Sequence, residues 1–226
     1  VKRNYALAAV NLSANFTAVA GKASIIDMTT QTVVREIELP GQPDSVAVSP
    51  DGNYMVIAIE NEHDEDLGDG APPQFPAGSL VVMDTSSDDP SMWTFSVVNM
   101  TALEGARFPE DPEPEFVDIN NDNICVITLQ ENNGIALVDL ATRTVMNSFT
   151  AGAADISQID ATEEDVIMQT ESLTGVLREP DGVTWIGIDY FAMADEGDLD
   201  GGSRGFTVFD TSGTVVYTSG NELEWW

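Results

Sequence analysis

Three glutamates recur at matching positions of a repeated sequence unit, namely Glu60, Glu131 and Glu196. Each follows a run of apolar, β-forming residues, and that run is preceded by a proline, an acid and a polar turn. If the repeats surround a common axis, the three carboxylates converge on one mouth. There they repel one another unless a cation binds them or their pKa values rise. The alternative, that they are solvated loop charges or turn caps, stays open.

More acids flank these glutamates in two loops. They are Asp64, Glu65, Asp66 and Asp69 in the first loop, and Asp195, Asp198 and Asp200 in the second. Ligand sets made only of oxygen suit Ca²⁺, which accepts about six to eight oxygens in flexible loops. We therefore predict a Ca²⁺ site with the candidate ligands Glu60, Glu131, Glu196, Asp195, Asp198 and Asp200. A zinc site of the usual composition is nearly excluded, because His63 is the only histidine and Cys125 the only cysteine.

The sequence offers little for nucleophilic catalysis, since it has no Gly-x-Ser-x-Gly motif and no histidine beside a serine pattern. A metal-dependent phosphoesterase would instead combine metal ions with a cationic clamp for phosphate. Arg178 and Arg204 flank the acidic loops in a chain with only 8 basic residues. The candidate catalytic residues are accordingly Glu131, Glu196, Arg178 and Arg204. For Arg204, pairing with neighbouring aspartates is the alternative.

The repeat that carries these residues predicts an all-β fold. The unit that begins at Pro43 recurs at Pro114, 71 residues later (114 − 43), and again at Pro180. Each unit contains four short strands, and a tandem array of four-stranded sheets is typical of a β-propeller. We predict antiparallel blades at 1–42 (partial), 43–113, 114–179 and 180–220, with the start of another at 221–226. About four blades are then present, in a larger ring completed by residues outside this chain, or alternatively in a closed four-bladed ring.

The predicted loops differ between the two faces of the propeller. Long connections, at 60–78, 100–113, 150–179 and 195–205, fall on one face, and tight turns fall on the other. Scaffolds of this kind usually work from the elaborated side, so we expect the site there. Residues 101–106 and 161–170 are predicted to form short helices. Aspartates that end an apolar strand, Asp27, Asp84, Asp139 and Asp210, are predicted to close turns through their own side chains.

The composition limits the possible partners. The chain of 226 residues has a net charge of -31, from 39 acids against 8 bases. Such a surface repels nucleic acid and attracts divalent cations or basic partners, although adaptation to a salty medium or plain solubility explains it equally well. No apolar run approaches the roughly 18 residues of a membrane span. Cys125, within a strand pattern, is predicted to be a small buried hydrophobe.

Three sequons for N-linked glycosylation occur, at Asn11, Asn15 and Asn99. A sequon is used only in a secreted eukaryotic chain, and it then lies in a surface loop. These three asparagines are therefore candidate glycosylation sites if the chain is secreted.

Several motifs resemble those of the choice-of-anchor I propeller family. They are Glu113-Pro114-Glu115, the run from Val126 to Asn133 with Ile135 to Asp139, Arg178 to Asp181, Ala194 to Asp198, and Gly202 to Phe206. The resemblance covers about residues 43–221, and the stretch from Ala151 to Thr170 departs from the family pattern. It implies a secreted or surface-attached propeller. Relatives are labelled mesenchyme-specific cell-surface glycoproteins or atypical alkaline phosphatases, and a shared fold does not carry chemistry with it.

Two functions from different classes follow. The first is an acidic, glycosylated extracellular module that is stabilised by Ca²⁺ and serves binding or structure. Its partners would be divalent cations and other extracellular proteins or the remaining propeller segment. The second is a Ca²⁺-dependent phosphomonoesterase, similar to the atypical alkaline phosphatases, with its site at the axial mouth. The resemblance and the acidic surface favour the first, and the arginines favour the second.

Overall fold

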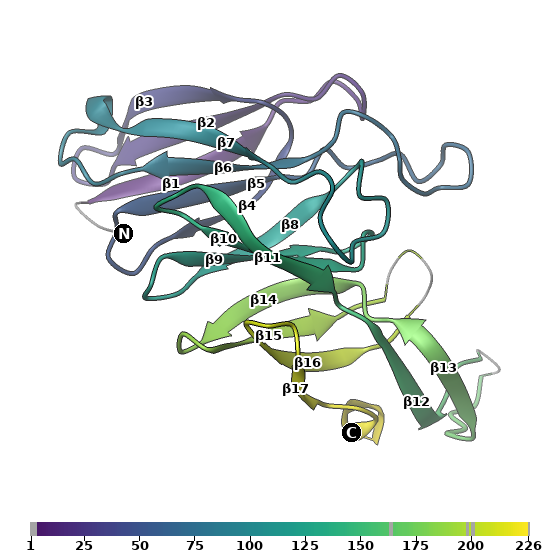
Figure 1. Ribbon diagram of the computed structural model, residues 1–226. Helices are drawn as coiled ribbons and strands as arrows, with labels where there is room; N and C mark the ends of the chain where they lie inside the picture. Colours follow the sequence, from purple (N-terminus) through teal and green to yellow (C-terminus); the bar gives the residue numbers. More distant parts are fainter. Residues whose placement is uncertain (1–3, 163–164, 198, 200–201, 226) are drawn as a thin grey trace.

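The chain folds into a series of antiparallel β-sheets that fan out side by side (Figure 1). The computed structural model describes residues 4–162, 165–197, 199 and 202–225. The first sheet holds β1 (Tyr5–Asn11), β2 (Gly21–Asp27) and β3 (Thr32–Leu39), and the second holds β4 (Pro43–Val48), β5 (Tyr54–Ile59), β6 (Ser79–Asp84) and β7 (Thr94–Asn99). The third holds β8 (Pro114–Ile119), β9 (Ile124–Leu129), β10 (Gly134–Asp139) and β11 (Thr144–Thr150). After a small sheet of β12 (Ala153–Ile159) and β13 (Glu171–Leu177), the last holds β14 (Pro180–Ile186), β15 (Tyr190–Asp195), β16 (Gly205–Asp210) and β17 (Val215–Thr218).

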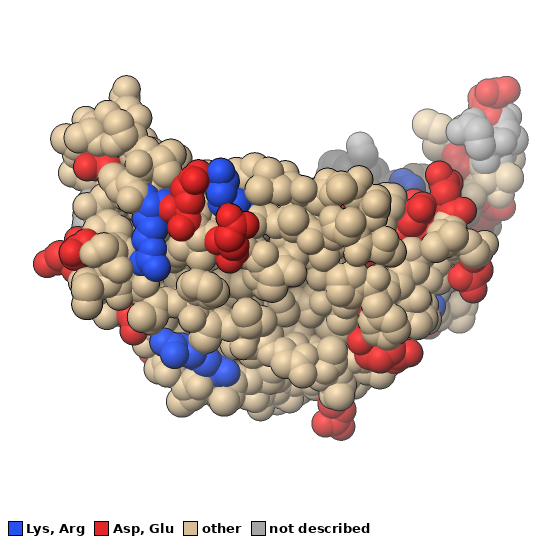
Figure 2. Space-filling model, turned by 90° about the horizontal axis from the view of Figure 1, so that it is seen from above, with Lys and Arg blue, Asp and Glu red and all other residues tan. Residues whose placement is uncertain are grey.

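The four larger sheets pack face to face around an axis. Their strands β4, β8 and β14 lie beside one another and are the innermost strands. Three apolar clusters, which include Ile57, Ile127 and Phe191, fill the spaces between successive sheets. Strands β5 and β9 are almost wholly buried because both faces of their sheets are covered. Seen from above, the molecule is an arc with a hollowed inner edge (Figure 2). The prediction of an all-β propeller with four-stranded antiparallel blades is confirmed.

Turns closed by aspartate mark the same place in each sheet. Asp27, Asp84, Asp139 and Asp210 end β2, β6, β10 and β16, and each accepts the backbone N–H two residues on, at 2.7 to 3.0 Å. This confirms the predicted turns. In the complete blades this aspartate ends the third strand, so β2 corresponds to the third strand of the first blade. Within the described residues, the first sheet therefore lacks the innermost strand that the other blades have.

Neither predicted helix forms in the described residues. Residues 101–106 make consecutive turns, because Ala102 and Gly105 adopt φ angles of 62° and 80°, which a right-handed helix does not permit. The described part of 161–170 belongs to the loop that joins β12 to β13, a sheet that the sequence did not predict. Short 3₁₀ turns occur at Pro90–Met92 and Glu222–Trp225. Among the described residues, no helix has the length and apolarity needed to traverse a bilayer.

We expect the aromatic contact between the last two blades to dominate their packing. Phe191 of β15 is fully buried, and its ring centroid lies 6.4 Å from that of Phe149 on β11 of the preceding blade and 5.8 Å from that of Phe209 in its own sheet. Phe191→Ala should lower the free energy of unfolding by about 3–5 kcal/mol, measured by urea denaturation followed by tryptophan fluorescence. The matched control Phe95→Ala, at a ring 43% exposed on β7, should cost less than about 1 kcal/mol. Equal losses for the two variants would contradict this packing.

Candidate functional site

An acidic cluster forms where the innermost strands begin. Asp44, Glu115 and Asp181 are the second residues of β4, β8 and β14, directly after the proline that starts each strand. Because these strands lie side by side, the three acids share the mouth of the axis. The charges of Asp44 and Asp181 contribute to raising the pKa of Glu115. The sequence interpretation assigned no role to these acids, although the proline–acid pair recurs in all three repeats.

Two of the predicted glutamates join this cluster because asparagines fix the loops that carry them. Asn61 and Asn132 each accept a hydrogen bond from the backbone N–H of the residue before the first-strand proline, at 2.8 and 2.9 Å. Glu60 and Glu131 directly precede these asparagines and are therefore held at the start of the innermost strand of their own blade. The charge of Glu131 contributes to raising the pKa of Glu60, as expected for carboxyls that face each other.

His63 places a positive charge inside the cluster. The side chain is 2% exposed, its Nδ1 lies 2.8 Å from the Glu113 carboxylate, and its Nε2 lies 3.2 Å from the carbonyl oxygen of Gly70. Both ring nitrogens face oxygen acceptors, so both carry a hydrogen and the ring is an imidazolium. The hydrogen bond to Glu113 raises the pKa of His63 to about 9. His63 is thus a built-in cation, although its ring, Glu113 and Glu131 offer ligand atoms within 4.8 Å of one another.

Burial raises the pKa of four carboxyls in the cluster, with repulsion between acids as the next cause: Asp44, Glu60, Glu115 and Glu131. The pKa of Glu60 rises to about 8, first through burial and then through the charge of Asp44. Glu115 and Glu131 are each 7% exposed, and burial raises the pKa of both. Within the described residues, the buried Oε2 of Glu131 has no hydrogen-bond partner. At neutral pH the cluster therefore keeps protons that a bound cation would displace.

Glu196 stays outside the cluster. It is exposed, and its Oε2 accepts a hydrogen bond of 2.8 Å from Gln130 Nε2. The loop after β15 contains no asparagine that could tie it to β14. The backbone N–H before Pro180 instead donates to Asn133 of the preceding blade, at 2.9 Å. Of the three repeated glutamates, the structure therefore brings only Glu60 and Glu131 together.

Arg178 and Asp195 form a buried structural pair away from the cluster. Arg178 donates from Nε to Thr207 Oγ1 at 3.0 Å and from Nη1 to the carbonyl oxygen of Ala151 at 2.8 Å. The same Nε lies 3.7 Å from Asp195 Oδ2, which also accepts the Thr207 hydroxyl at 2.8 Å. The Arg178 guanidinium thus connects the end of β13 to β16 through its hydrogen bonds inside the fold. The other two predicted ligands of this loop, Asp198 and Asp200, lie outside the described residues.

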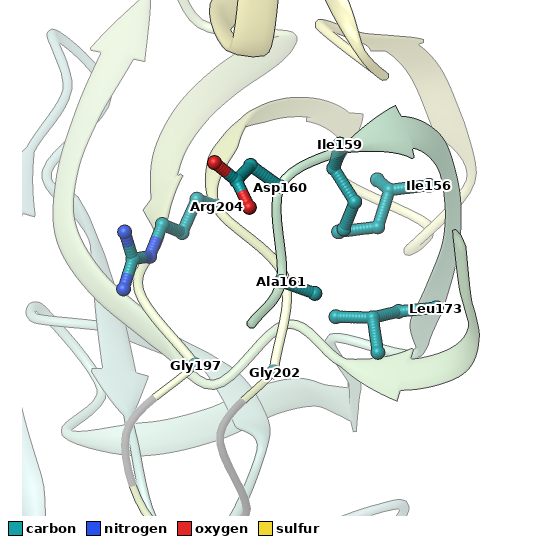
Figure 3. Close-up of a pocket in the computed structure, with 8 residues that line it drawn as sticks. All are labelled: Ile156, Ile159, Asp160, Ala161, Leu173, Gly197, Gly202 and Arg204. Carbon is teal, nitrogen blue, oxygen red and sulfur yellow. The ribbon is translucent and has the colours of Figure 1, made fainter. Parts of the chain in front are cut away.

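Arg204 lies on the surface in the loop before β16. It lines an open hollow together with Asp181 and Glu196, and a smaller cavity together with Asp160 (Figure 3). No ion pair among the described residues includes Arg204. The local partners considered from the sequence, Asp198 and Asp200, lie outside the described part of the chain.

The remaining predicted residues occupy the surface or the core. Asn11, Asn15 and Asn99 are exposed, and each side-chain oxygen accepts a backbone N–H two residues on. Glu65, Asp66 and Asp69 are exposed, and Asp64 is half-buried. Figure 2 shows acidic side chains spread over the viewed face. Cys125 is a buried free thiol, as predicted.

The raised pKa of Glu60 predicts a loss of stability with increasing pH. The folded state holds this proton up to about pH 8, whereas the unfolded chain releases it near 4.5. The resulting stabilisation is present below pH 4.5 and is lost as the pH rises to about 8. The test therefore compares Glu60→Gln with wild type in the presence of a chelator. As the pH rises from 5 to 8, the unfolding free energy of the variant should increase by about 2–4 kcal/mol relative to that of wild type. Urea denaturation measures this, and a constant difference between Glu60→Gln and wild type would refute it. The exposed control Glu65→Gln should run parallel to wild type.

Comparisons with known proteins agree with this fold. Hydrazine synthase from Kuenenia stuttgartiensis is similar with a TM-score of 0.58 and 10% identity, over 93% of this chain and 56% of that one. A protein from Lactobacillus plantarum is similar with a TM-score of 0.57 and 15% identity, over 97% of this chain and 53% of that one. The chain thus spans about half the length of these structures, and at such identities the likeness concerns the fold alone. No curated protein sequence matches the chain. A model of the choice-of-anchor I domain matches residues 1–201, and the chain therefore belongs to the choice-of-anchor I domain family.

Proposed function

We propose that this chain is an extracellular binding module whose acidic cluster holds a Ca²⁺ ion at the propeller axis. Membership of the choice-of-anchor I family supports a cell-surface anchoring or binding role. The ion would stabilise the junction of the innermost strands, where carboxyls from successive blades meet. The module would then present its loops to other extracellular molecules.

One observation carries this proposal: carboxyls from neighbouring blades converge, and two of them, Glu115 and Glu131, are buried, with one buried oxygen that lacks a partner. Glu60 and Asp44 come from the second sheet, and Glu115 and Glu131 come from the third. Their oxygens are hard ligands of the kind that Ca²⁺ prefers. A buried carboxylate oxygen without a hydrogen bond, such as Oε2 of Glu131, is costly, and coordination to a cation removes that cost.

Exposed sequons and an uncovered sheet face are consistent with an extracellular role. Asn11, Asn15 and Asn99 are exposed and therefore accessible to glycosylation in a secreted chain.

The outer face of the last sheet presents two exposed aromatic rings that contact each other, Phe206, 38% exposed, and Tyr217, 44% exposed. In the two preceding four-stranded sheets the corresponding face is covered by the next blade. A further propeller segment would cover this face in the same way.

The Ca²⁺ proposal predicts a specific thermal stabilisation. Ca²⁺ added to chelated protein should raise the melting temperature, and at about 100 times Kd the gain in unfolding free energy is about 2.7 kcal/mol. Glu131→Gln should abolish the shift, because it removes one ligand charge and leaves the fold intact. Glu196→Gln is the matched control and should keep the full shift. A melting temperature that neither Ca²⁺ nor chelator changes would exclude the cation site.

The second candidate function is a Ca²⁺-dependent phosphomonoesterase. It draws support from Arg204, which shares an open hollow with Asp181 and Glu196 next to the cluster. Arg178 gives no support, because its guanidinium is committed inside the fold. A chromogenic phosphate ester, assayed with Ca²⁺ and with chelator, distinguishes the two functions. Turnover that needs Ca²⁺ and is lost in both Glu131→Gln and Arg204→Gln would favour the enzyme. Absence of turnover leaves the binding module.

A further inference from the structure

The two-stranded sheet that interrupts the propeller pattern lies apart from the acidic cluster and borders a cavity of its own. This cavity of about 220 Å³ lies between the sheet and the loop that leads into β16. None of the carboxyls of the acidic cluster lines it, so the cavity is independent of the Ca²⁺ proposal. Gly197 and Gly202 form one wall, where the N–H of Gly202 donates to the carbonyl oxygen of Gly197 at 2.9 Å. A Cβ on Gly202 would lie 2.1 Å from a backbone oxygen, so this close wall depends on glycine.

The cavity has an apolar end. Ile156 and Ile159 project from β12, are 5% and 4% exposed, and meet Leu173 of β13. Figure 3 shows these three side chains pointing toward a common space, with Ala161 beside them. The space is smaller than the cavities of about 300–1,000 Å³ that hold drug-sized ligands. Its apolar end therefore suits one short aliphatic group.

The other end of the cavity carries two opposite charges. In Figure 3 the Asp160 carboxylate points away from the isoleucines, toward the side where Arg204 lies. Asp160 Oδ2 accepts the backbone N–H of Met168 at 3.1 Å. Oδ1 is buried and has no hydrogen-bond partner in the described residues. The described ion pairs do not include Asp160 or Arg204, so the two charges do not satisfy each other.

We propose that this cavity binds a free α-amino acid with a branched aliphatic side chain. The ligand's ammonium group donates to Asp160 Oδ1, and its carboxylate pairs with the Arg204 guanidinium. Its side chain packs among Ile156, Ile159 and Leu173. An amine alone would make no use of the Arg204 guanidinium, and a carboxylic acid alone would leave Asp160 Oδ1 unsatisfied. A zwitterion with a short aliphatic body matches both ends of the cavity at once.

Calorimetric titration with L-leucine tests this proposal, together with two compounds that each lack one charged group. These are 3-methylbutylamine, without the carboxylate, and 4-methylpentanoate, without the ammonium group. Leucine should bind more tightly than either compound. Asp160→Asn should weaken leucine and the amine at least about tenfold, and Arg204→Gln should weaken leucine and the acid to a similar degree. Asp189→Asn, at an exposed turn, is the control and should bind leucine like wild type.

Melting curves of the variants show whether each one folds, and Asp160→Asn should keep the full Ca²⁺ shift. Failure of the Ca²⁺ proposal would leave leucine binding untouched, so the two can fail separately. The proposal is overturned if leucine does not bind at millimolar concentration. It is also overturned if the amine binds as tightly as leucine and Arg204→Gln changes neither affinity. Leucine binding that survives both substitutions would place the ligand elsewhere on the protein.

Discussion

The repulsion between carboxyls at the propeller axis is the constraint on which the centre of this molecule depends. Packing the innermost strands side by side places Asp44, Glu115 and Asp181 at one mouth, where burial and mutual charge raise the pKa of Glu115. A propeller cannot avoid this convergence, because its blades share one axis. The chain relieves it in part with the imidazolium of His63, and the raised pKa values show that the relief is incomplete.

Charged and polar side chains perform two distinct tasks around this cluster. Asn61 and Asn132 anchor the loops that aim Glu60 and Glu131 at the axis, each through one hydrogen bond to the start of an innermost strand. Arg178 and Asp195, in contrast, are consumed by packing between β13 and β16. A buried pair of this kind loses much when one partner is removed, so it is retained without any ligand. Which of the two tasks a side chain performs thus depends on how deeply it is buried and on its hydrogen-bond partners, and not on its residue type.

The sheet of β12 and β13 gives this propeller a feature that its repeats do not share. It lies between the third and the fourth blade, it carries its own apolar wall, and the loop that joins its strands holds an unsatisfied carboxylate oxygen. Insertions at the ends of blades change function at little cost, because the blade cores do not have to repack. The acidic cluster belongs to the repeat, whereas the cavity belongs to the insertion.

The sequence by itself determined the fold class, the strands of the repeated blades and the aspartate turns, because each of these depends on a local pattern of alternating apolar residues and turn formers. It also identified Glu60 and Glu131, which repeat with the blades. Only the tertiary structure decided that Glu196 points to solvent, that Arg178 is buried, and that Asp44, Glu115 and His63 complete the cluster. These outcomes depend on contacts between residues that are far apart in the sequence. A local pattern does not show which loop an asparagine side chain will hydrogen-bond, or which charged side chain a neighbouring strand will bury. For the same reason the hairpin of β12 and β13, whose strands pair across a long loop, was mistaken in part for a helix.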